Sequence, residues 1–551
     1  MYYFDCLCEV GPRNAKDAAA PWTTRDILGC MDRCGIAGAL VTHTLSIQDD
    51  PIHARKLLAR ETARAPKRLF PVWVALPGDA GDGDASPAAL LKSMAQHRVR
   101  AVKLFPKTHN WPITASIIGP WLEALERAEI LTLINFSELP GSKPGESFNG
   151  SYETLDWMLG AFPRLPVLLQ DMWWSTQRVI LPLMARHRNL HIEFSTFQVN
   201  RGIEEYAERF GPERLLFATG LPDKSAGAAR AFIDYAQIPR RDKELIAGGN
   251  LTRLLGGVRP EAPRFRMDAL CRRAAAGKPM AGAVADAHCH VLPRGAGGTG
   301  VNVMFRGDAK GILESRSPLG VKTSALMSWM GPASSEPLEG NRIVSEAVRK
   351  YPGHFLGLVS INPTHLSART LMAEVRRRVE REGFIGLKPY GRLGLGYTHP
   401  LYDPCWKYAD RRGLYTLLHL GGAAGGIEVV HALAEKYPDA QWVVAHSGTS
   451  FDVARRVAAE MLRHPNVWAE LTLTSVTNGL IEWLVRAVGD DRILFGTDAP
   501  MRDPRPQLGW VVWANVPAAS RRRILGENFQ RLLAMRKMQG RAAGPMKGAS
   551  R

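Results

Sequence analysis

Two histidines, a cysteine and an aspartate stand together in the stretch DAHCH, residues 286–290. All three residue types can bind metal ions. Side chains alternate along a β-strand, so Asp286, His288 and His290 share one face and Cys289 points the other way. We therefore expect the two imidazoles to be available to a metal ion and Cys289 to pack against helices. A His-x-His pair on a strand is as often a surface pair as a site, so the motif needs support from elsewhere in the chain.

Further metal-binding side chains follow other apolar runs downstream. His419, His446 and Asp498 each lie at the end of such a run. A lone histidine in this position is more often a hydrogen-bonded core residue than a ligand, but the combination with His288 and His290 is hard to reach by chance. Imidazole and carboxylate ligands with an open water position are typical of a catalytic divalent ion. The set predicts one divalent metal ion, Zn²⁺ first, with Mn or Fe as alternatives.

The elements that must position these residues form a repeating pattern of short apolar runs and amphipathic stretches. Eight strands are expected at 284–290, 321–329, 355–363, 384–390, 414–420, 442–448, 467–472 and 493–500. Eight strands with intervening helices are what a closed parallel (β/α)8 barrel requires. In such barrels the active site lies at the carboxyl ends of the strands, where the histidines and Asp498 fall.

The same pattern occurs upstream of DAHCH. Strands are expected at 2–9, 36–44, 69–77, 99–106, 130–136, 165–171, 190–196 and 214–222. RLLFATGLP (214–222) matches RILFGTDAP (492–500), and IAGGNLTRLL matches ILGENFQRLL, at nearly constant spacing. We therefore predict an α/β protein of two tandem (β/α)8 TIM barrels that arose by internal duplication. The expected divisions are a barrel over 1–255, a linker over 256–283, a second barrel over 284–534 and a flexible tail over 535–551.

The second half resembles the amidohydrolase superfamily, in the mononuclear branch that includes aminocarboxymuconate semialdehyde decarboxylase-like enzymes. The resemblance rests on Asp286-x-His288-x-His290, on His419, on VVAHSG and ILFGTDAP, and on the closing ILGENFQRLL. It implies a metal ion held by His288, His290, His419 and Asp498. His446 and Asp498 would be the catalytic groups, with His446 polarising substrate or water. Members of this branch hydrolyse C–N or C–O bonds or decarboxylate without oxidation.

Three cationic residues are candidates for substrate binding. Lys388 ends the fourth expected strand of the second half. In binuclear relatives a lysine there is carbamylated and bridges two metals, whereas a plain ammonium would anchor a carboxylate or form a structural ion pair. We favour the plain ammonium, because Lys103 has the equivalent place in the first half. Arg502 and Arg505, after the eighth strand, could pair with an anionic substrate or be solvated loop charges.

The first half lacks the ligand set of the second. The residues at the matching positions are Leu7 for His288, Glu9 for His290, Asn135 for His419, Gln170 for His446 and Gly220 for Asp498. Leucine and glycine offer no ligand atom, and amides are poor ligands for Zn²⁺. We expect a degenerate barrel without a metal site, a pseudoenzyme domain. It could replace the partner subunit of a homodimer, shape the active-site mouth, bind a ligand, or serve only as a folding companion.

The composition limits the partners that the protein could have. The net charge is +18, but part of the basic excess lies in the linker and the tail, and no nucleic-acid motif is found. No apolar run reaches the roughly 18 residues of a membrane helix. The N-terminus shows no secretory signal, and the seven scattered cysteines fit a reducing cytosol. We expect a cytoplasmic protein with a small-molecule substrate and no nucleic-acid or membrane partner.

Three functions fit these features. The first is a metal-dependent hydrolase of a small carboxylate- or amide-bearing molecule, acting through a metal-activated water in the second barrel. The second is a non-oxidative, metal-dependent decarboxylase on the same residues. The third is a non-catalytic scaffold or binding protein, which the intact residue set argues against. The two barrels are expected to dock on each other, as homodimer subunits do.

Overall fold

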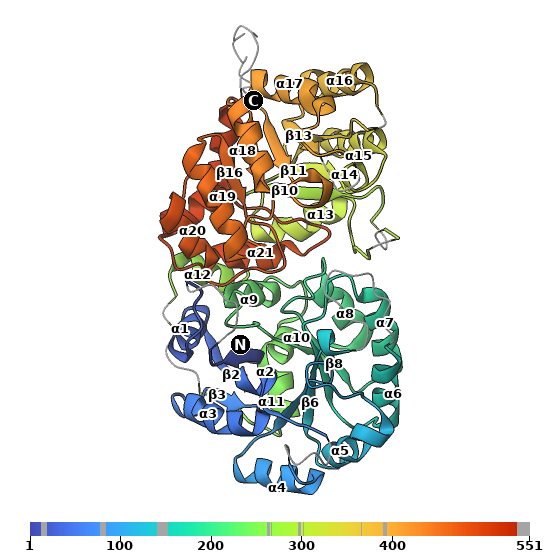
Figure 1. The fold of residues 1–551 in the computed structure, drawn as a ribbon, viewed down its shortest axis with the longest axis vertical. Coiled ribbons are helices and arrows are strands. Elements are labelled where there is room, and N and C mark those ends of the chain that lie inside the picture. Colours follow the sequence, from blue (N-terminus) through green and yellow to red (C-terminus); the bar gives the residue numbers. More distant parts are fainter. Residues whose placement is uncertain are drawn as a thin grey trace, which may run out of the picture.

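The computed structural model describes residues 1–12, 19–77, 84–139, 152–261, 265, 267–295, 299–300, 302–364, 366–389 and 394–536. The N-terminal half lies below the C-terminal half in Figure 1, along the long axis of the molecule. Both halves are built of parallel strands with helices around them, so the predicted tandem barrels are confirmed. Residues 537–551, most of the predicted tail, lie outside the described residues.

The second half is a barrel of eight parallel strands in sequential order. Closure occurs where the last strand meets the first: the Ala287 N–H donates to the Phe495 carbonyl at 2.9 Å, and the His290 N–H donates to the Ala499 carbonyl at 2.6 Å. This closure brings the loop that carries Asp498 beside His290. All eight predicted strands are present: β10 (Ala285–Val291), β11 (Thr323–Ser328), β12 (Phe355–Ile361), β13 (Gly386–Pro389), β14 (Tyr415–Leu418), β15 (Gln441–Val444), β16 (Val467–Glu470) and β17 (Ile493–Leu494).

The first half repeats this barrel with one interruption. The predicted strand at 69–77 is split at Val72 into two pieces, after Pro71, which has no N–H for the ladder. The Val72 N–H still donates to the Val41 carbonyl at 2.9 Å, and the Cys6 N–H closes the barrel on the Phe217 carbonyl at 3.0 Å. The strands are β1 (Tyr3–Val10), β2 (Ile36–His43), β3 (Leu69–Pro71), β4 (Trp73–Val74), β5 (Ala101–Leu104), β6 (Leu131–Asn135), β7 (Val167–Gln170), β8 (Leu190–Glu193) and β9 (Leu215–Leu216).

Helices cover the outside of both barrels. Those of the first half and the connection are α1 (Thr24–Cys34), α2 (Leu45–Gln48), α3 (Pro51–Ala63), α4 (Pro87–Gln96), α5 (Ala115–Arg127), α6 (Glu153–Ala161), α7 (Gln177–Arg186), α8 (Gly202–Phe210), α9 (Ala226–Asp234), α10 (Arg240–Glu244), α11 (Asn250–Leu254) and α12 (Ala269–Ala275). Those of the second half are α13 (Ala309–Arg316), α14 (Met330–Ala333), α15 (Pro337–Lys350), α16 (Ala368–Arg376), α17 (Asp403–Arg412), α18 (Ile427–Lys436), α19 (Phe451–Arg463), α20 (Leu480–Val488), α21 (Pro504–Val512), α22 (Ala518–Arg522) and α23 (Asn528–Ala534).

Short helical turns of three to five residues complete the chain: η1 (Phe136–Glu138), η2 (Pro212–Arg214), η3 (Leu245–Gly249), η4 (Ser317–Leu319), η5 (Arg377–Arg381), η7 (Pro400–Tyr402), η8 (Gly422–Ala424) and η9 (Arg523–Glu527). The amphipathic stretch 367–382 contains α16, which the wider turn η5 continues. Within the described ranges, no helix has both the length and the apolar character needed to cross a membrane.

Helix α19 shows why these segments fold as helices on a barrel. The Ser450 side chain accepts a hydrogen bond from the Val453 N–H at 3.3 Å and so caps the first turn. Its buried residues are Phe451, Ala454, Val457, Ala458, Glu460 and Met461. Most of them are three or four residues apart and so lie on one stripe of the helix, while the charged residues Asp452, Arg455, Arg456 and Arg463 are exposed.

The duplication is visible in matching buried hydrogen bonds. Asp5 accepts from the Leu7 and Thr219 N–H groups, each at 2.9 Å. Asp286 accepts from the N–H groups of His288 and Thr497, each at 3.0 Å. Both carboxylates tie the first strand of a barrel to the loop after its eighth strand. The same framework is therefore kept in both halves although their strand-end residues differ.

One predicted correspondence between the halves is wrong by one residue. The sequence paired Gln170 with His446, but Asp171 has the place of His446. The Asp171 N–H donates to Glu193 at 2.6 Å, as the His446 N–H donates to Glu470 at 3.4 Å. Both residues also have positive φ, 53° for Asp171 and 61° for His446. The polar character shared by Gln170 and Asp171 hid this shift, which only strand pairing reveals.

The two halves pack closely through equivalent helices. Helices α9 and α21, which follow the eighth strand of each barrel, lie against each other at the boundary in Figure 1. A Cβ on Gly509 would meet the Gly227 carbonyl oxygen at 2.3 Å and the Ala231 Cβ at 2.5 Å. Only small residues allow this approach. The predicted docking of the barrels is thus an interface in which the two structurally equivalent helices face one another, as in a two-fold dimer.

A buried ion pair crosses the same interface. The Arg505 guanidinium donates to Glu204 at 2.7 and 2.9 Å and also pairs with Asp503. Arg505 is 4% exposed, and both carboxylates are buried. Asp503 in turn accepts from the backbone N–H of Arg201 at 2.8 Å. These contacts assign Arg505 to holding the halves together, and we no longer expect it to bind substrate.

In the described part of the connection between the halves, helix α12 packs against both of them. Asp268 caps helix α12 by accepting from the Cys271 N–H at 2.9 Å, and it also pairs with Arg521 of the second half. Cys271 and Ala274 are buried, and α12 contacts both α9 and α21. The small residues of this segment permit such close packing. Helix α12 therefore forms part of the interface between the halves.

Replacing Glu204 with glutamine is expected to destabilise the full-length protein by roughly 3 kcal/mol, because a buried Arg505 loses a charged partner. Burial alone would raise the pKa of Glu204, but Arg505 lowers it to about 2, below its ordinary value of 4.5. The ion pair therefore contributes stability above pH 4.5 and loses it as the pH falls toward 2. Urea unfolding at pH 7 and pH 3.5 measures both effects.

The matched control is Glu205→Gln, on the same helix, where Glu205 pairs only with Arg209 in the more exposed i,i+4 position. It should change the unfolding midpoint little. A Glu204→Gln protein as stable as wild type at pH 7 would show that the pair adds nothing to docking.

Candidate metal centre

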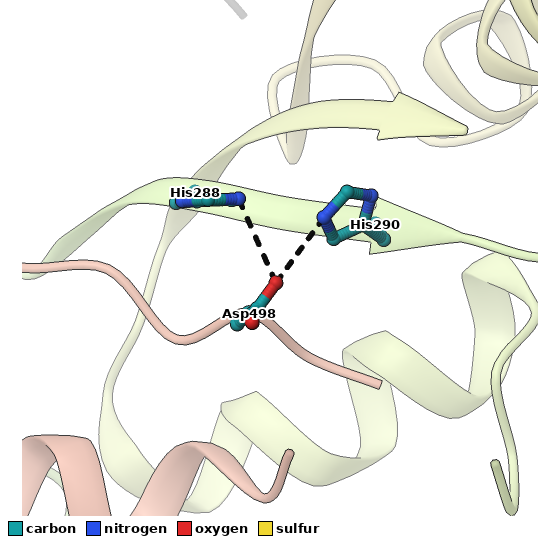
Figure 2. Close-up of side chains that lie close together, drawn as sticks. All are labelled: His288, His290 and Asp498. Atoms are coloured by element: carbon teal, nitrogen blue, oxygen red, sulfur yellow. Dashed lines mark ion pairs between the residues drawn. The ribbon is translucent and has the colours of Figure 1, made fainter. Parts of the chain in front are cut away.

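Three of the predicted ligands converge at the carboxyl ends of β10 and β17. Asp498 Oδ1 lies 3.6 Å from His288 Nε2 and 3.2 Å from His290 Nε2. Figure 2 shows both imidazoles on one face of their strand, with the Asp498 carboxylate reaching toward them from the neighbouring loop. All three side chains are buried, at 1%, 5% and 1% exposure respectively for His288, His290 and Asp498. The alternation expected for DAHCH is therefore present, and Cys289 is buried on the other face.

The separation of these atoms fits a divalent ion. Zn–N bonds of about 2.0–2.1 Å in a tetrahedral arrangement place neighbouring ligand atoms roughly 3.3 Å apart. Among the residues that the structure describes, His288 Nε2 is buried without a hydrogen-bond partner. A buried imidazole lone pair facing a carboxylate and a second imidazole is costly unless something bridges them. The donor set of two nitrogens and one oxygen is one that Zn²⁺, Mn²⁺ or Fe²⁺ accepts.

Glu470 fixes the ligand atom of His288, a role that the sequence did not reveal. Glu470 Oε2 lies 2.9 Å from His288 Nδ1, so Nδ1 carries the proton and Nε2 presents its lone pair to the site. Thr472 holds the other carboxylate oxygen through its N–H at 2.7 Å. A carboxylate at this place in both halves, Glu193 and Glu470, was the available signal.

His446 and His419 lie beside this group but are not part of the closest cluster. His446 Nδ1 lies 2.7 Å from the Thr472 carbonyl oxygen and therefore donates to it. His446 Nε2 must then accept from His419 Nδ1, 3.1 Å away. The His446 ring also lies 5.1 Å from that of His288, so all four histidines share one end of the barrel.

The electrostatics of the site prepare it for a cation. Burial lowers the pKa of His288 and of His419 well below the ordinary value and that of His446 to about 4, so these rings are neutral at pH 7. Burial alone would raise the pKa of Asp498, but Arg502 and the histidines hold it well below its usual range. Neutral imidazoles and an ionised carboxylate are the protonation states that metal ligands need.

Two of the predicted substrate-binding cations do lie at the site. Arg502 pairs with Asp498 and donates through Nε to the Thr474 hydroxyl at 2.8 Å. Lys388 is 1% exposed, and among the described residues no acceptor lies within hydrogen-bond distance of its Nζ. Burial lowers the pKa of Lys388 to about 8, with Asp498 and Glu470 acting against the shift. The site thus holds two cations beside its carboxylates.

The first half contributes a residue to the neighbourhood of this site. The Trp174 ring lies under the Arg502 guanidinium, with 5.3 Å from the guanidinium carbon to the ring centroid. Trp174 follows β7, so it comes from the strand ends of the first barrel. Nothing in the sequence indicated that residues 174 and 502 meet, because the contact depends on how the barrels dock.

The corresponding place in the first half holds an ion pair. Lys224, the counterpart of Arg502, places its Nζ 2.5 Å from Asp171 Oδ1. A Cβ on Gly220, the counterpart of Asp498, would meet the Lys224 side chain at 2.9 Å, so the lysine fills the space where Asp498 stands in the second half. Within the described part of the first half, no group of three or more His, Cys, Asp or Glu residues has metal-binding spacing.

The fold and the site define a (β/α)8-barrel protein with a candidate His-His-Asp metal centre at the strand ends. The family model described as amidohydrolase matches residues 39–257 and 285–534. The chain therefore belongs to the amidohydrolase family, and the match includes both halves. The predicted resemblance is confirmed.

Comparison with solved structures finds proteins that each match about half of this chain. A 2,6-dihydroxybenzoate decarboxylase from Rhizobium is 18% identical, covers 46% of this chain and 99% of its own, and has a TM-score of 0.38. The 5-carboxyvanillate decarboxylase from Sphingomonas paucimobilis is 18% identical, with 46% and 99% covered and a TM-score of 0.37. The 4-oxalomesaconate hydratase from Rhodopseudomonas palustris is 12% identical, with 46% and 96% covered and a TM-score of 0.36. A comparison with curated proteins finds no match.

Proposed function

We propose that the protein is a metal-dependent hydrolase of a small, carboxylate-bearing molecule, with its active site at the strand ends of the second barrel. The observation that carries the proposal is the convergence of His288, His290 and Asp498 at 3.2 and 3.6 Å in a buried site. His419 is proposed as a further ligand, because the family resemblance implies it and its ring lies 4.8 Å from that of His446 at the same end of the barrel. Zn²⁺ suits this nitrogen-rich set, and Mn and Fe remain alternatives.

A divalent ion bound there would supply a Lewis acid that lowers the pKa of a water ligand to about 7. Asp498 would accept the proton of the attacking water. Arg502 pairs with Oδ2 and keeps the carboxylate ionised until that step. His446 would take this proton from Asp498 at Nε2 and then, as an imidazolium that also donates to the Thr472 carbonyl, donate a hydrogen bond to the oxyanion that develops on the substrate.

The cations of the site indicate the substrate class. Arg502 and Lys388 are buried beside the proposed ligands, where an uncompensated charge is costly. A substrate carboxylate would supply the acceptor that Lys388 Nζ lacks among the described residues. We therefore propose an anionic substrate, bound by Lys388 at one end and exposed to the metal at the other.

Non-oxidative decarboxylation is the second candidate, on the same residues. The position of Lys388 favours it, since the ammonium would hold a substrate carboxylate next to the metal ligands and not at a distant rim. The metal and His446 would then orient the substrate and manage protonation of the carbanion that CO₂ leaves behind.

The two reactions are separated by their products. Full-length protein loaded with Zn²⁺, Mn²⁺ or Fe²⁺ would be offered a panel of carboxylated aromatic acids, lactones and amides. Release of labelled CO₂ from a carboxyl-labelled substrate supports decarboxylation, and ring opening or amine release without CO₂ supports hydrolysis. If the metal-loaded protein binds metal at the site but turns over no member of either class, the result supports a non-catalytic scaffold or binding protein instead.

The first half is proposed to close the active site of the second through Trp174. Trp174→Ala is expected to raise KM for an anionic substrate about 3- to 30-fold, because a cation–π contact worth roughly 0.5–2 kcal/mol no longer orients Arg502. Metal content should not change, because Trp174 makes no contact with the proposed ligands in the described structure. Steady-state kinetics together with elemental analysis measure both quantities.

Trp174→Phe should keep KM close to the wild-type value, since an aromatic face remains. Trp157→Ala, a tryptophan of α6 that packs on Phe162, serves as the matched control for general destabilisation of the first half. An unchanged KM for Trp174→Ala would leave the first half without a part in substrate binding.

A further inference from the structure

A second cluster of ligand-type side chains lies on the outside of the second barrel. His431 belongs to α18 and Glu460 to α19, and His464 directly follows the last residue of α19. Among the described residues, it is one of three groups with metal-binding spacing, and the other two both contain His288. The exposed fractions of the three side chains are 44% for His431, 7% for Glu460 and 15% for His464. The cluster is therefore half-buried between two helices and open on one side.

Its geometry matches that of the candidate catalytic centre. His431 Nδ1 lies 3.0 Å from Glu460 Oε2 and 3.0 Å from His464 Nε2, and His464 Nε2 lies 3.6 Å from Glu460 Oε2. These three separations bracket the roughly 3.3 Å between ligand atoms of a tetrahedral zinc ion. In the catalytic cluster the corresponding separations are 3.2 and 3.6 Å.

Hydrogen bonds alone satisfy this triangle poorly. His431 Nδ1 has one in-plane direction, which is either a lone pair or an N–H, yet it faces both Glu460 Oε2 and His464 Nε2 at 3.0 Å. A proton given to Glu460 is not available to His464, and the reverse also holds. A cation at the centre of the triangle would accept all three lone pairs at once.

The remaining carboxylate oxygen is already occupied. Glu460 Oε1 pairs with Arg463 at 3.0 Å, so Oε2 alone is directed at the histidines. This arrangement fits a carboxylate that binds a metal through one oxygen. Three protein ligands leave a fourth position to water on the exposed side, where His431 is most accessible.

We propose that His431, Glu460 and His464 form a second metal site, selective for ions that prefer nitrogen ligands, of which Zn²⁺ is the test case. The site binds α18 to α19, the helices on either side of β15, whose carboxyl end leads to His446. Its role is structural, and it is independent of the proposed reaction. The fully loaded protein then holds two ions, one at the strand ends and one between the helices.

The experiment removes two proposed ligands of the strand-end site and measures the zinc that the protein still binds. Full-length protein carrying His288→Ala and His290→Ala is freed of metal with a chelator, equilibrated with Zn²⁺, dialysed and analysed for zinc. One equivalent per chain is expected. Adding His431→Gln should reduce the content to zero, while adding His53→Gln, an exposed histidine on α3 of the first half, should leave one equivalent. Substitution with Co²⁺ should give tetrahedral absorption bands that disappear with His431→Gln.

A parallel measurement in the otherwise wild-type chain covers the case in which the double variant does not fold. There, His431→Gln should lower zinc from two equivalents to one and leave the activity of the strand-end site unchanged. The proposal is overturned if the folded double variant holds no zinc, or if zinc content and cobalt bands are the same with and without His431→Gln.

Discussion

A His288→Ala protein is expected to lose the metal ion of the strand-end site and, with it, all metal-dependent turnover. His288 is 1% exposed and supplies one of the three closest ligand atoms. Loss of an outer partner of a ligand already costs roughly 10- to 100-fold in metal affinity, and loss of the ligand itself costs more. The substitution also leaves Glu470 without its His288 partner, which adds an uncompensated buried carboxylate.

Elemental analysis after dialysis against a weak chelator measures this loss, and circular dichroism shows that the fold persists. His53→Ala is the matched control, since it removes an exposed histidine in the first half. Because the outer cluster at His431 is proposed to keep its own ion, the expected change is from two equivalents of zinc to one. Retention of both ions by His288→Ala would contradict the proposed ligand set.

The His446→Asn protein is expected to keep the metal, but its turnover rate should fall by about 10²-fold or more. Loss of a general acid–base group, or of one oxyanion donor, costs about this much. Asparagine can still reach toward the Thr472 carbonyl, which now lies 2.7 Å from His446 Nδ1, so the local structure should survive. The fall should appear in kcat, because the group acts on the transition state.

The metal content of His446→Asn is to be compared with that of His288→Ala. The two substitutions should separate, with metal lost in His288→Ala and retained in His446→Asn. Equal loss of metal from both proteins would make His446 a ligand and would refute the division of roles proposed above. A His446→Asn protein with full metal content and full activity would remove His446 from the reaction altogether.

Sequence periodicity was sufficient to predict both barrels. The apolar runs and the matched motifs depend on local alternation and on duplication, which a linear chain displays directly. The grouping of His288, His290 and Asp498 was predictable for the same reason. DAHCH alternates along one strand, and a closed barrel brings the end of its eighth strand, with Asp498, beside its first.

Several features could not be predicted from local periodicity, because they depend on strand register or on how the two barrels dock. The correspondence of Asp171 with His446 is set by strand pairing and not by residue similarity. Arg505 was predicted to bind substrate from its place in a catalytic loop, yet the docked first half supplies Glu204 and makes it a structural ion pair. The composition predicted only a linker for the connection containing α12, and the two barrels provide the surfaces on which α12 packs.

The sequence by itself therefore determined the class of fold and indicated which half carries the proposed ligands and most of those residues, because these follow from local periodicity and from the topology of a closed barrel. Only the tertiary structure decided which groups hold the ligands in place and which surfaces meet. Glu470 orients His288, Trp174 reaches Arg502 from the other barrel, and His431 meets His464 between two helices. Each of these contacts joins residues far apart in sequence, and their closeness is a consequence of packing that no local pattern records.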